Sequence, residues 1–213
     1  MDFDKPSGIW CKNGLPLRSV LKEWIEVTKE LARNWKRSEK GDVPWWYNER
    51  ANLSVFAGGV WRSGGRAFEE FSSEKKKRWK STGRLHGSYS GRVDLFFETR
   101  YGEKFYVEAK VCESGVQRAS HKRVPSIVTV LDVACEDAES PKQNAHRKLG
   151  MVFVKPYIQT KAITHLQDQV SDWMKQIWNI EFDAMAWVFP LSYSCGEIGQ
   201  WKCPGVVVLI KEV

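Results

Sequence analysis

Three charged side chains stand inside two otherwise apolar segments of the sequence. The stretch RVDLFFETRYGEKFYVEAKV, residues 92–111, contains Asp94, Glu108 and Lys110. Alternation along a strand gives each segment one apolar face and one face with a charge at its centre. If the segments pair as a hairpin, Asp94 shares a face with Glu108 and Lys110. Two neighbouring carboxylates repel each other, and a divalent cation removes that repulsion. The spacing therefore indicates a metal site.

A plainer interpretation is that these charges face solvent from a sheet covered on one side only. The Glu-Ala-Lys tripeptide alone does not decide between the two, because it is common by chance. The combination is more specific. It comprises an aspartate inside an apolar strand, a short turn, a second apolar strand with Glu-x-Lys, and an upstream helix that contains Glu49.

The remaining sequence predicts helices packed on a sheet. Apolar residues at helical spacing, Pro and Gly signals and β-branched runs mark the elements. The predicted helices are 15–38, 45–62, 66–80, 137–150 with Gly150 as its end, and one capped by Thr160. The predicted strands are 92–98, 105–111, 150–157, AMAWVFP (184–190) and GVVVLIKEV (205–213). Residues 114–126 are expected to form a polar loop, and 127–134 fits either a strand or a helix. This order is typical of an α/β or α+β protein.

Length and composition suit one compact unit. The chain has 213 residues, of which 42% are hydrophobic and 28% charged, so we expect a soluble globular protein with its own core. No apolar run approaches the ~20 residues of a membrane span, and the start, MDFDKPSGIW, does not resemble a secretory signal. We therefore expect a cytoplasmic protein without a membrane partner. Residues 1–43 are expected to form an N-terminal helical extension, and 44–213 the main domain.

The net charge of +7 and the pI of about 9.1 favour encounters with polyanions such as nucleic acids. Basic residues concentrate just before the charged strands and in a second segment after them. The first group is Lys75, Lys76, Lys77, Arg78, Lys80 and Arg84, and the second is Lys122 and Arg123. They are candidates for contacts with a phosphate backbone. A solvated surface is the alternative for both groups.

With these residues in place, the chain resembles the PD-(D/E)XK nuclease superfamily. The motif stands here as Val93-Asp94, thirteen residues, then Glu108-Ala109-Lys110. Val93 replaces the proline of the family name. The resemblance covers roughly 45–158 and follows the family's order of helix, three strands, helix and strand. It implies a restriction-endonuclease-like core, with a central mixed β-sheet of about five strands flanked by helices.

The resemblance also implies a role for each motif residue. Asp94, Glu108 and the backbone carbonyl of Ala109 would hold Mg²⁺, with Mn²⁺ as a substitute. Lys110 would contact the attacking water and the phosphate, either as a fixed positive charge or, if its pKa falls, as a base. Glu49 would bind metal-coordinated water. An exposed helical glutamate is the alternative for Glu49.

The helix expected at 137–150 carries Gln143 and Arg147, four residues apart on one face. Some exonuclease-like members place a glutamine there with an aromatic residue four positions later, where this chain has Arg147. Both residues are candidates for phosphate contacts, and a solvated helix face explains them equally well.

The activity implied is that of a metal-dependent deoxyribonuclease, an endonuclease more than an exonuclease. Restriction, phage defence and mobile-element processing are the roles that such an enzyme suits, by analogy with the family. DNA is the expected partner, and a homodimer or a larger nuclease complex is the expected assembly. Two other hypotheses remain. One is a non-enzymatic nucleic-acid-binding subunit on the same fold, and the other is an unrelated structural domain that binds no divalent ion.

Overall fold

The computed structural model describes residues 1–35, 43–78, 85–117, 120–139, 146–190 and 196–213, with the backbone alone at 35, 73–78, 85–90, 120–121 and 198. Its elements in chain order are β1 (Ser7–Cys11), α1 (Arg18–Trp35), the 3₁₀ helix η1 (Pro44–Trp46), α2 (Glu49–Arg62), β2 (Arg66–Arg78), β3 (Leu85–Glu98), β4 (Lys104–Gly115), α3 (Ser120–Glu139), β5 (Arg147–Gln159), the 3₁₀ helix η2 (Thr160–Ala162), α4 (Leu166–Ile177), β6 (Ala184–Val188), β7 (Glu197–Ile198), β8 (Trp201–Lys202) and β9 (Val206–Glu212).

A mixed β-sheet forms the middle of the molecule. Within the described ranges, seven strands follow the order β1-β6-β9-β5-β4-β3-β2, and β8 joins β7 to the end of β5. The pair β4 and β5 is parallel, and their other neighbours are antiparallel. A parallel pair needs a long crossover, which α3 supplies. The expected mixed sheet flanked by helices is confirmed, but about five strands was too few.

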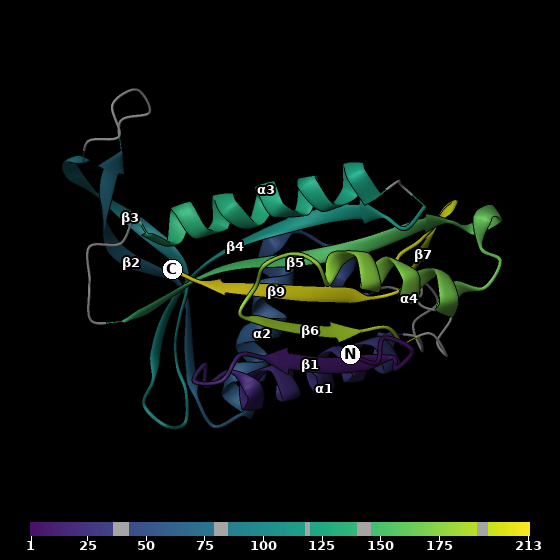
Figure 1. Ribbon diagram of the computed structural model, residues 1–213. Coiled ribbons are helices and arrows are strands. Elements are labelled where there is room, and N and C mark those ends of the chain that lie inside the picture. Colours follow the sequence, from purple (N-terminus) through teal and green to yellow (C-terminus); the bar gives the residue numbers. More distant parts are fainter. Residues whose placement is uncertain (36–42, 79–84, 118–119, 140–145, 191–195) are drawn as a thin grey trace.

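Helices cover both faces of this sheet (Figure 1). One core layer joins α1 and α2 to one face, and the other joins α3 and α4 to the opposite face. In β5, Met151 and Phe153 belong to the first layer, and Val152 and Val154 belong to the second. Strands buried on both faces become apolar at every position, which explains the continuous apolar run that predicted this strand.

The described part of the first 43 residues contributes to this sheet and core. Strand β1 lies at the sheet edge and pairs with β6 from Ser7↔Val188 to Cys11↔Ala184. Helix α1 places Trp24 in the core at 1% exposure. The segment expected as a helical extension therefore contains both an edge strand and a core helix.

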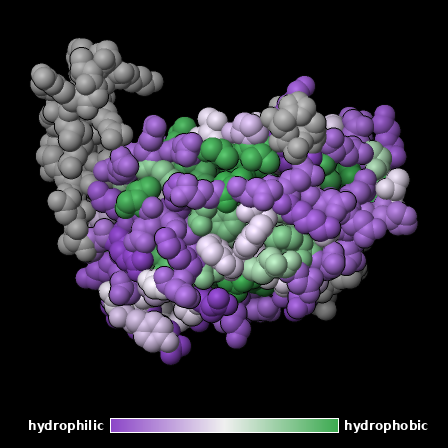
Figure 2. Space-filling model, viewed as in Figure 1, coloured by the Kyte–Doolittle hydropathy of each residue, from purple (hydrophilic) through white to green (hydrophobic). Residues whose placement is uncertain are grey.

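Hydrophilic side chains dominate the surface shown in Figure 2, while hydrophobic ones gather over α3 and between α3 and α4. None of the helices in the described part of the chain is long and apolar enough to cross a bilayer.

The helix predicted at 66–80 was wrong, because Arg66–Arg78 is strand β2. It pairs antiparallel with β3 from Arg66↔Glu98 to Arg78↔Leu85. Its Glu and Lys residues have good helix propensity. Pairing with β3 overrides that local preference, as tertiary context commonly does.

The region after β4 also differs from the prediction. The expected loop at 114–126 contains the start of α3, which continues through the ambiguous 127–134 and ends at Glu139. The expected helix at 137–150 is therefore wrong, and Gly150 lies within β5. A Cβ on Gly150 would come within 2.7 Å of the Cys135 backbone nitrogen in α3, so glycine here permits close packing of helix on sheet. Farther on, α4 begins at Leu166 rather than at a Thr160 cap.

Two adjacent glycines in α2 offer a test of how α1 packs against α2. A Cβ on Gly59 would lie 2.7 Å from the Trp24 backbone nitrogen, whereas one on Gly58 would meet only the Val27 side chain at 3.7 Å. We expect Gly59→Ala to lower the free energy of unfolding by about 1–3 kcal/mol, because backbone atoms must move apart. Gly58→Ala is the matched control and should raise it by up to about 1 kcal/mol. Urea denaturation measures both, and equal effects would contradict this packing.

Candidate active site at the fork of β3 and β4

Asp94 stands where β3 and β4 separate. The two strands pair from Leu95↔Val107 to Glu98↔Lys104, and beyond Leu95 strand β3 continues beside β2. At this fork the Asp94 Oδ2 atom accepts a hydrogen bond from the Ala109 N–H at 2.9 Å. A side-chain oxygen thus satisfies a backbone donor that a carbonyl of β3 would otherwise satisfy.

The register places the three motif side chains on one face of the sheet. The pair Leu95↔Val107 makes Asp94 and Glu108 the next opposed positions, and alternation puts Lys110 on the same face. This is the face that α3 covers. Glu108 is buried at 4% exposure, while the Lys110 side chain is 28% exposed. The hairpin geometry expected from the sequence therefore brings these residues together.

Glu49 approaches the same fork from α2. It is the first residue of that helix, and the Asn48 side chain caps the helix by accepting from the Ala51 N–H at 3.1 Å. Burial raises the pKa of Glu49, Lys110 lowers it, and Asp94 raises it. The net pKa is higher than that of an ordinary glutamate, and the mutual influence of these charges identifies them as one cluster.

A fifth member of the cluster, Asp137 of α3, was missed in the sequence. Its Oδ2 atom lies 3.0 Å from the Lys110 Nζ atom. Burial lowers the pKa of Lys110, but the ion pair with Asp137 and the charges of Glu49 and Asp94 outweigh burial and leave that pKa raised. Lys110 is therefore an ammonium at neutral pH. The apolar residues of 120–139 recur at helical spacing. Interpreting this segment as one helix could have placed Asp137 near β4.

Glu70 of β2 lies at the rim of the cluster and was also missed. Its carboxylate pairs with Arg50 at 2.7 Å and with Arg92 at 3.3 Å, and its charge contributes to the raised pKa of Glu49. Its φ of 54° is in the left-handed region, which is unfavourable for a residue other than glycine. No pattern in the sequence indicates this conformation.

The residues expected to contact nucleic acid lie in different parts of the structure, and some of them lie outside the described residues. Lys75, Lys76, Lys77 and Arg78 lie in β2, where the backbone alone is described. Lys80, Arg84 and Gln143 lie outside the described residues. Lys122 is exposed on the first turn of α3.

Two of the expected contacts with nucleic acid are corrected by the structure. Arg123 is 3% exposed and donates to the carbonyls of Gly115 and Val116 at 3.2 and 2.6 Å, so it fastens the β4–α3 connection. Arg147 belongs to β5 and not to a helix, and it forms a two-bond ion pair with Glu212 at 2.5 and 2.8 Å. These guanidinium groups are engaged within the protein.

The donor set at the fork fits a hard divalent cation. Asp94 and Glu108 supply carboxylates, and the N–H and C=O of one strand residue point to the same side, so the Ala109 carbonyl faces the gap beside Asp94. No cluster of three or more His, Cys, Asp or Glu side chains suited to a metal occurs among the described residues. Mg²⁺ often takes only one or two protein carboxylates and retains several waters, so the two carboxylates and the carbonyl suffice.

Comparisons with known proteins found no match to any family model, curated protein or solved structure.

The raised pKa of Glu49 has a consequence for stability. Its ordinary pKa is 4.5; the folded state binds the proton more tightly than the unfolded state, so stability falls as pH rises through the folded-state pKa. We expect wild type to lose stability relative to Glu49→Gln over a pH range that begins at about 4.5 and extends through the raised folded-state pKa. Thermal denaturation across this range measures the difference, with exposed Glu103→Gln as the control. A constant difference between wild type and Glu49→Gln would contradict the raised pKa.

Asp137→Asn is expected to lower the pKa of Lys110, because it removes the anion that opposes the effect of burial. The stability contributed by the ion pair is present below the ordinary lysine pKa of 10.5 and is lost as pH rises through the raised value. NMR titration of ¹³C-methylated lysines measures this pKa directly. Asp132→Asn, on an exposed part of the same helix, should leave it unchanged. A Lys110 signal that titrates identically in Asp137→Asn would rule out the pair.

Proposed function

We propose that this chain is a metal-dependent deoxyribonuclease with a restriction-endonuclease-like core, which hydrolyses phosphodiester bonds at the β3–β4 fork. The observation that carries the proposal is the hydrogen bond from the Ala109 N–H to Asp94. It holds the aspartate beside Glu108 and Lys110 at the point where the two strands open. A phosphate group brought to this gap would meet two carboxylates, a backbone carbonyl and an ammonium.

The free-energy cost of this arrangement supports a functional role. Glu108 is 4% exposed and stands opposite a second carboxylate, and burying like charges close together is unfavourable. A chain that retains the charges gains a site for a cation, and Mg²⁺ bound here would act as a Lewis acid and lower the pKa of its bound water.

Lys110 serves as a fixed positive charge in this proposal, and not as a base. Its pKa is raised, so it keeps its proton at neutral pH and can stabilise the negative charge that grows on the phosphate oxygens during in-line attack by water. An incoming phosphate competes with Asp137 for this ammonium. Burial raises the pKa of Glu49 above that of an ordinary glutamate, and in this role its carboxyl group would accept a hydrogen bond from the attacking water and orient it.

The biological setting is proposed from the same resemblance. A basic nuclease of this size suits restriction, phage defence or mobile-element processing, and an endonuclease that cuts both strands of DNA needs two active sites. A homodimer or a larger nuclease complex would supply the second site.

Removal of either charge from the fork should abolish cleavage. Asp94→Asn keeps an oxygen for the Ala109 N–H but loses the negative charge, and Lys110→Met keeps the length of the side chain but loses the positive charge. We expect each change to slow the Mg²⁺-dependent nicking of supercoiled DNA by at least about 100-fold. The measurement is conversion of plasmid to open-circular and linear forms in Mg²⁺, Mn²⁺ and EDTA.

Two substitutions in the same hairpin are the matched controls. The first is Glu98→Gln, at a residue on the same strand and face as Asp94. The second is Lys104→Met, at the residue that pairs with Glu98. Both should retain wild-type cleavage. DNA binding without cleavage by wild-type protein in either metal would instead favour the non-enzymatic binding subunit, and RNA cleavage without DNA cleavage would overturn the choice of substrate.

A further inference from the structure

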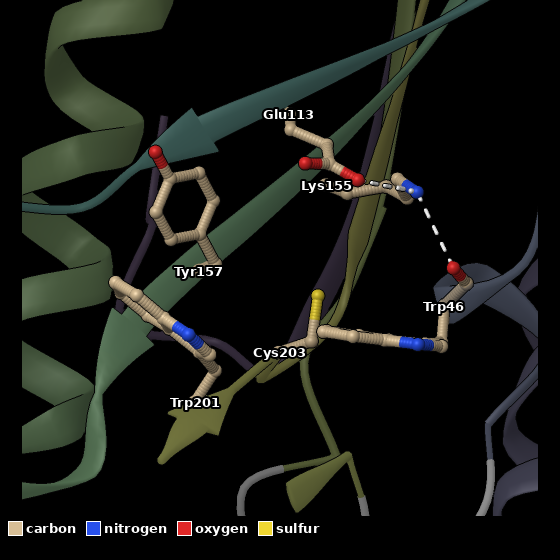
Figure 3. Close-up of a pocket in the computed structure, with 6 residues that line it drawn as sticks. All are labelled: Trp46, Glu113, Lys155, Tyr157, Trp201 and Cys203. Carbon is tan, nitrogen blue, oxygen red and sulfur yellow. Dashed lines mark hydrogen bonds and ion pairs between the residues drawn. The ribbon is translucent and has the colours of Figure 1, made fainter. Parts of the chain in front are cut away.

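A concave site lies at the carboxyl ends of β4 and β5. It is a pocket of about 400 Å³, within the size range of small-molecule sites. Figure 3 shows its lining residues, which come from η1, β4, β5, β8 and the segment after β8. They are Trp46, Glu113, Lys155, Tyr157, Trp201 and Cys203.

Aromatic rings form two sides of this pocket. Tyr157 and Trp201 lie on one side, with ring centroids 5.4 Å apart and an interplanar angle of 82°, and Trp46 lies on the opposite side (Figure 3). Trp201 is held there because β8 pairs with the end of β5 at Gln159↔Trp201. Aromatic walls on two sides suit a flat ring that stacks against them.

A buried ammonium closes one end of the pocket and fixes its shape. Lys155 is 6% exposed, and its Nζ atom contacts the Trp46 and Tyr47 carbonyls at 3.4 and 3.3 Å and a Glu113 oxygen at 3.2 Å. These contacts tie the segment before α2 to β5 and hold Trp46 in place. The Glu113 side chain remains 69% exposed, so its carboxylate can accept hydrogen bonds from a bound molecule.

The thiol in the pocket is a structural group and not a nucleophile. Burial raises the pKa of Cys203 to about 12, and its Sγ atom donates to the Pro156 carbonyl at 3.0 Å. It therefore stays protonated at neutral pH. The pocket is equipped to bind a molecule by stacking and hydrogen bonding, without covalent chemistry.

The pocket and the fork share two structural elements. Along β4, Glu113 follows Lys110 by three residues, which is about 10 Å in a strand. In the segment that leads into α2, Trp46 precedes Glu49 by three residues. The Lys110 side chain lies on the α3 side of the sheet, and Glu113 lies on the α2 side. A nucleic-acid strand that leaves the fork past the start of α2 would reach the pocket within a few nucleotides.

We infer that this pocket holds one unpaired nucleobase of the nucleic-acid strand whose phosphate lies at the fork. The inference rests on the proposed function. A base within a duplex cannot enter such a pocket, so the base must come from a single strand or be turned out of the helix. The Glu113 carboxylate accepts from amino groups, as carboxylates do from the amino group of cytosine. The pocket should therefore favour adenine, cytosine or guanine over thymine.

Fluorescence of 2-aminopurine, an adenine isomer, tests this pocket without cleavage. The probe is a single 2-aminopurine placed within oligothymidylate, with binding measured in EDTA so that a catalytic failure cannot affect the result. Stacking between the aromatic walls should quench the probe when wild-type protein binds. Trp201→Ala should lose the quenching and weaken binding about tenfold or more, and Trp201→Phe should restore most of both.

Trp61→Ala is the matched control, because Trp61 is 53% exposed on α2 and away from the pocket. It should bind and quench like wild type. Unquenched probe with wild type, or unchanged quenching with a folded Trp201→Ala or Tyr157→Ala variant, overturns the inference. Parallel arms use an RNA oligomer and free dAMP. Binding of either oligomer that depends on Trp201 supports the inference and identifies the kind of strand, whereas binding of free dAMP alone that depends on Trp201 overturns it. Quenching without cleavage in Mg²⁺ would separate this pocket from the nuclease proposal.

Discussion

The hydrogen bond from the Ala109 N–H to Asp94 is the interaction on which the candidate site depends. A gap for a phosphate can open only where strands β3 and β4 stop pairing with each other. A carboxylate that replaces a backbone carbonyl at the fork satisfies the first freed donor and at the same time holds one oxygen-bearing side chain at the opening. The 2.9 Å bond therefore both ends the pairing and positions a functional group.

The charges around this fork are tolerated because the rest of the molecule is well packed. Helices α1 and α2 on one side and α3 and α4 on the other bury the sheet on both faces. That rigid frame brings Glu49 and Asp137 to Lys110 from opposite layers. Burial and neighbouring carboxylates raise the pKa of Glu49, and the ion pair with Asp137 keeps Lys110 charged. This arrangement creates the electrostatic field that a phosphate would meet.

The segment that leads into α2 connects the two candidate sites. Lys155 anchors its backbone at Trp46 and Tyr47, and Glu49 begins the helix only two residues later. A movement of this segment would change the aromatic pocket and the fork together. The segment therefore links the pocket to the fork through the backbone, although Glu113 and Lys110 lie on different faces of β4.

The sequence by itself determined that Asp94, Glu108 and Lys110 share a sheet face. It also determined the buried strands and helices α1 and α2, because these follow from the periodicity of apolar residues among near neighbours in the chain. Tertiary structure alone decided that 66–80 is a strand, that Asp137 pairs with Lys110, and that the expected phosphate-binding Arg123 is buried. The aromatic pocket likewise joins residues more than 100 positions apart. Such features depend on contacts between distant segments, whose free energy outweighs local propensity and leaves no periodic signal in the sequence.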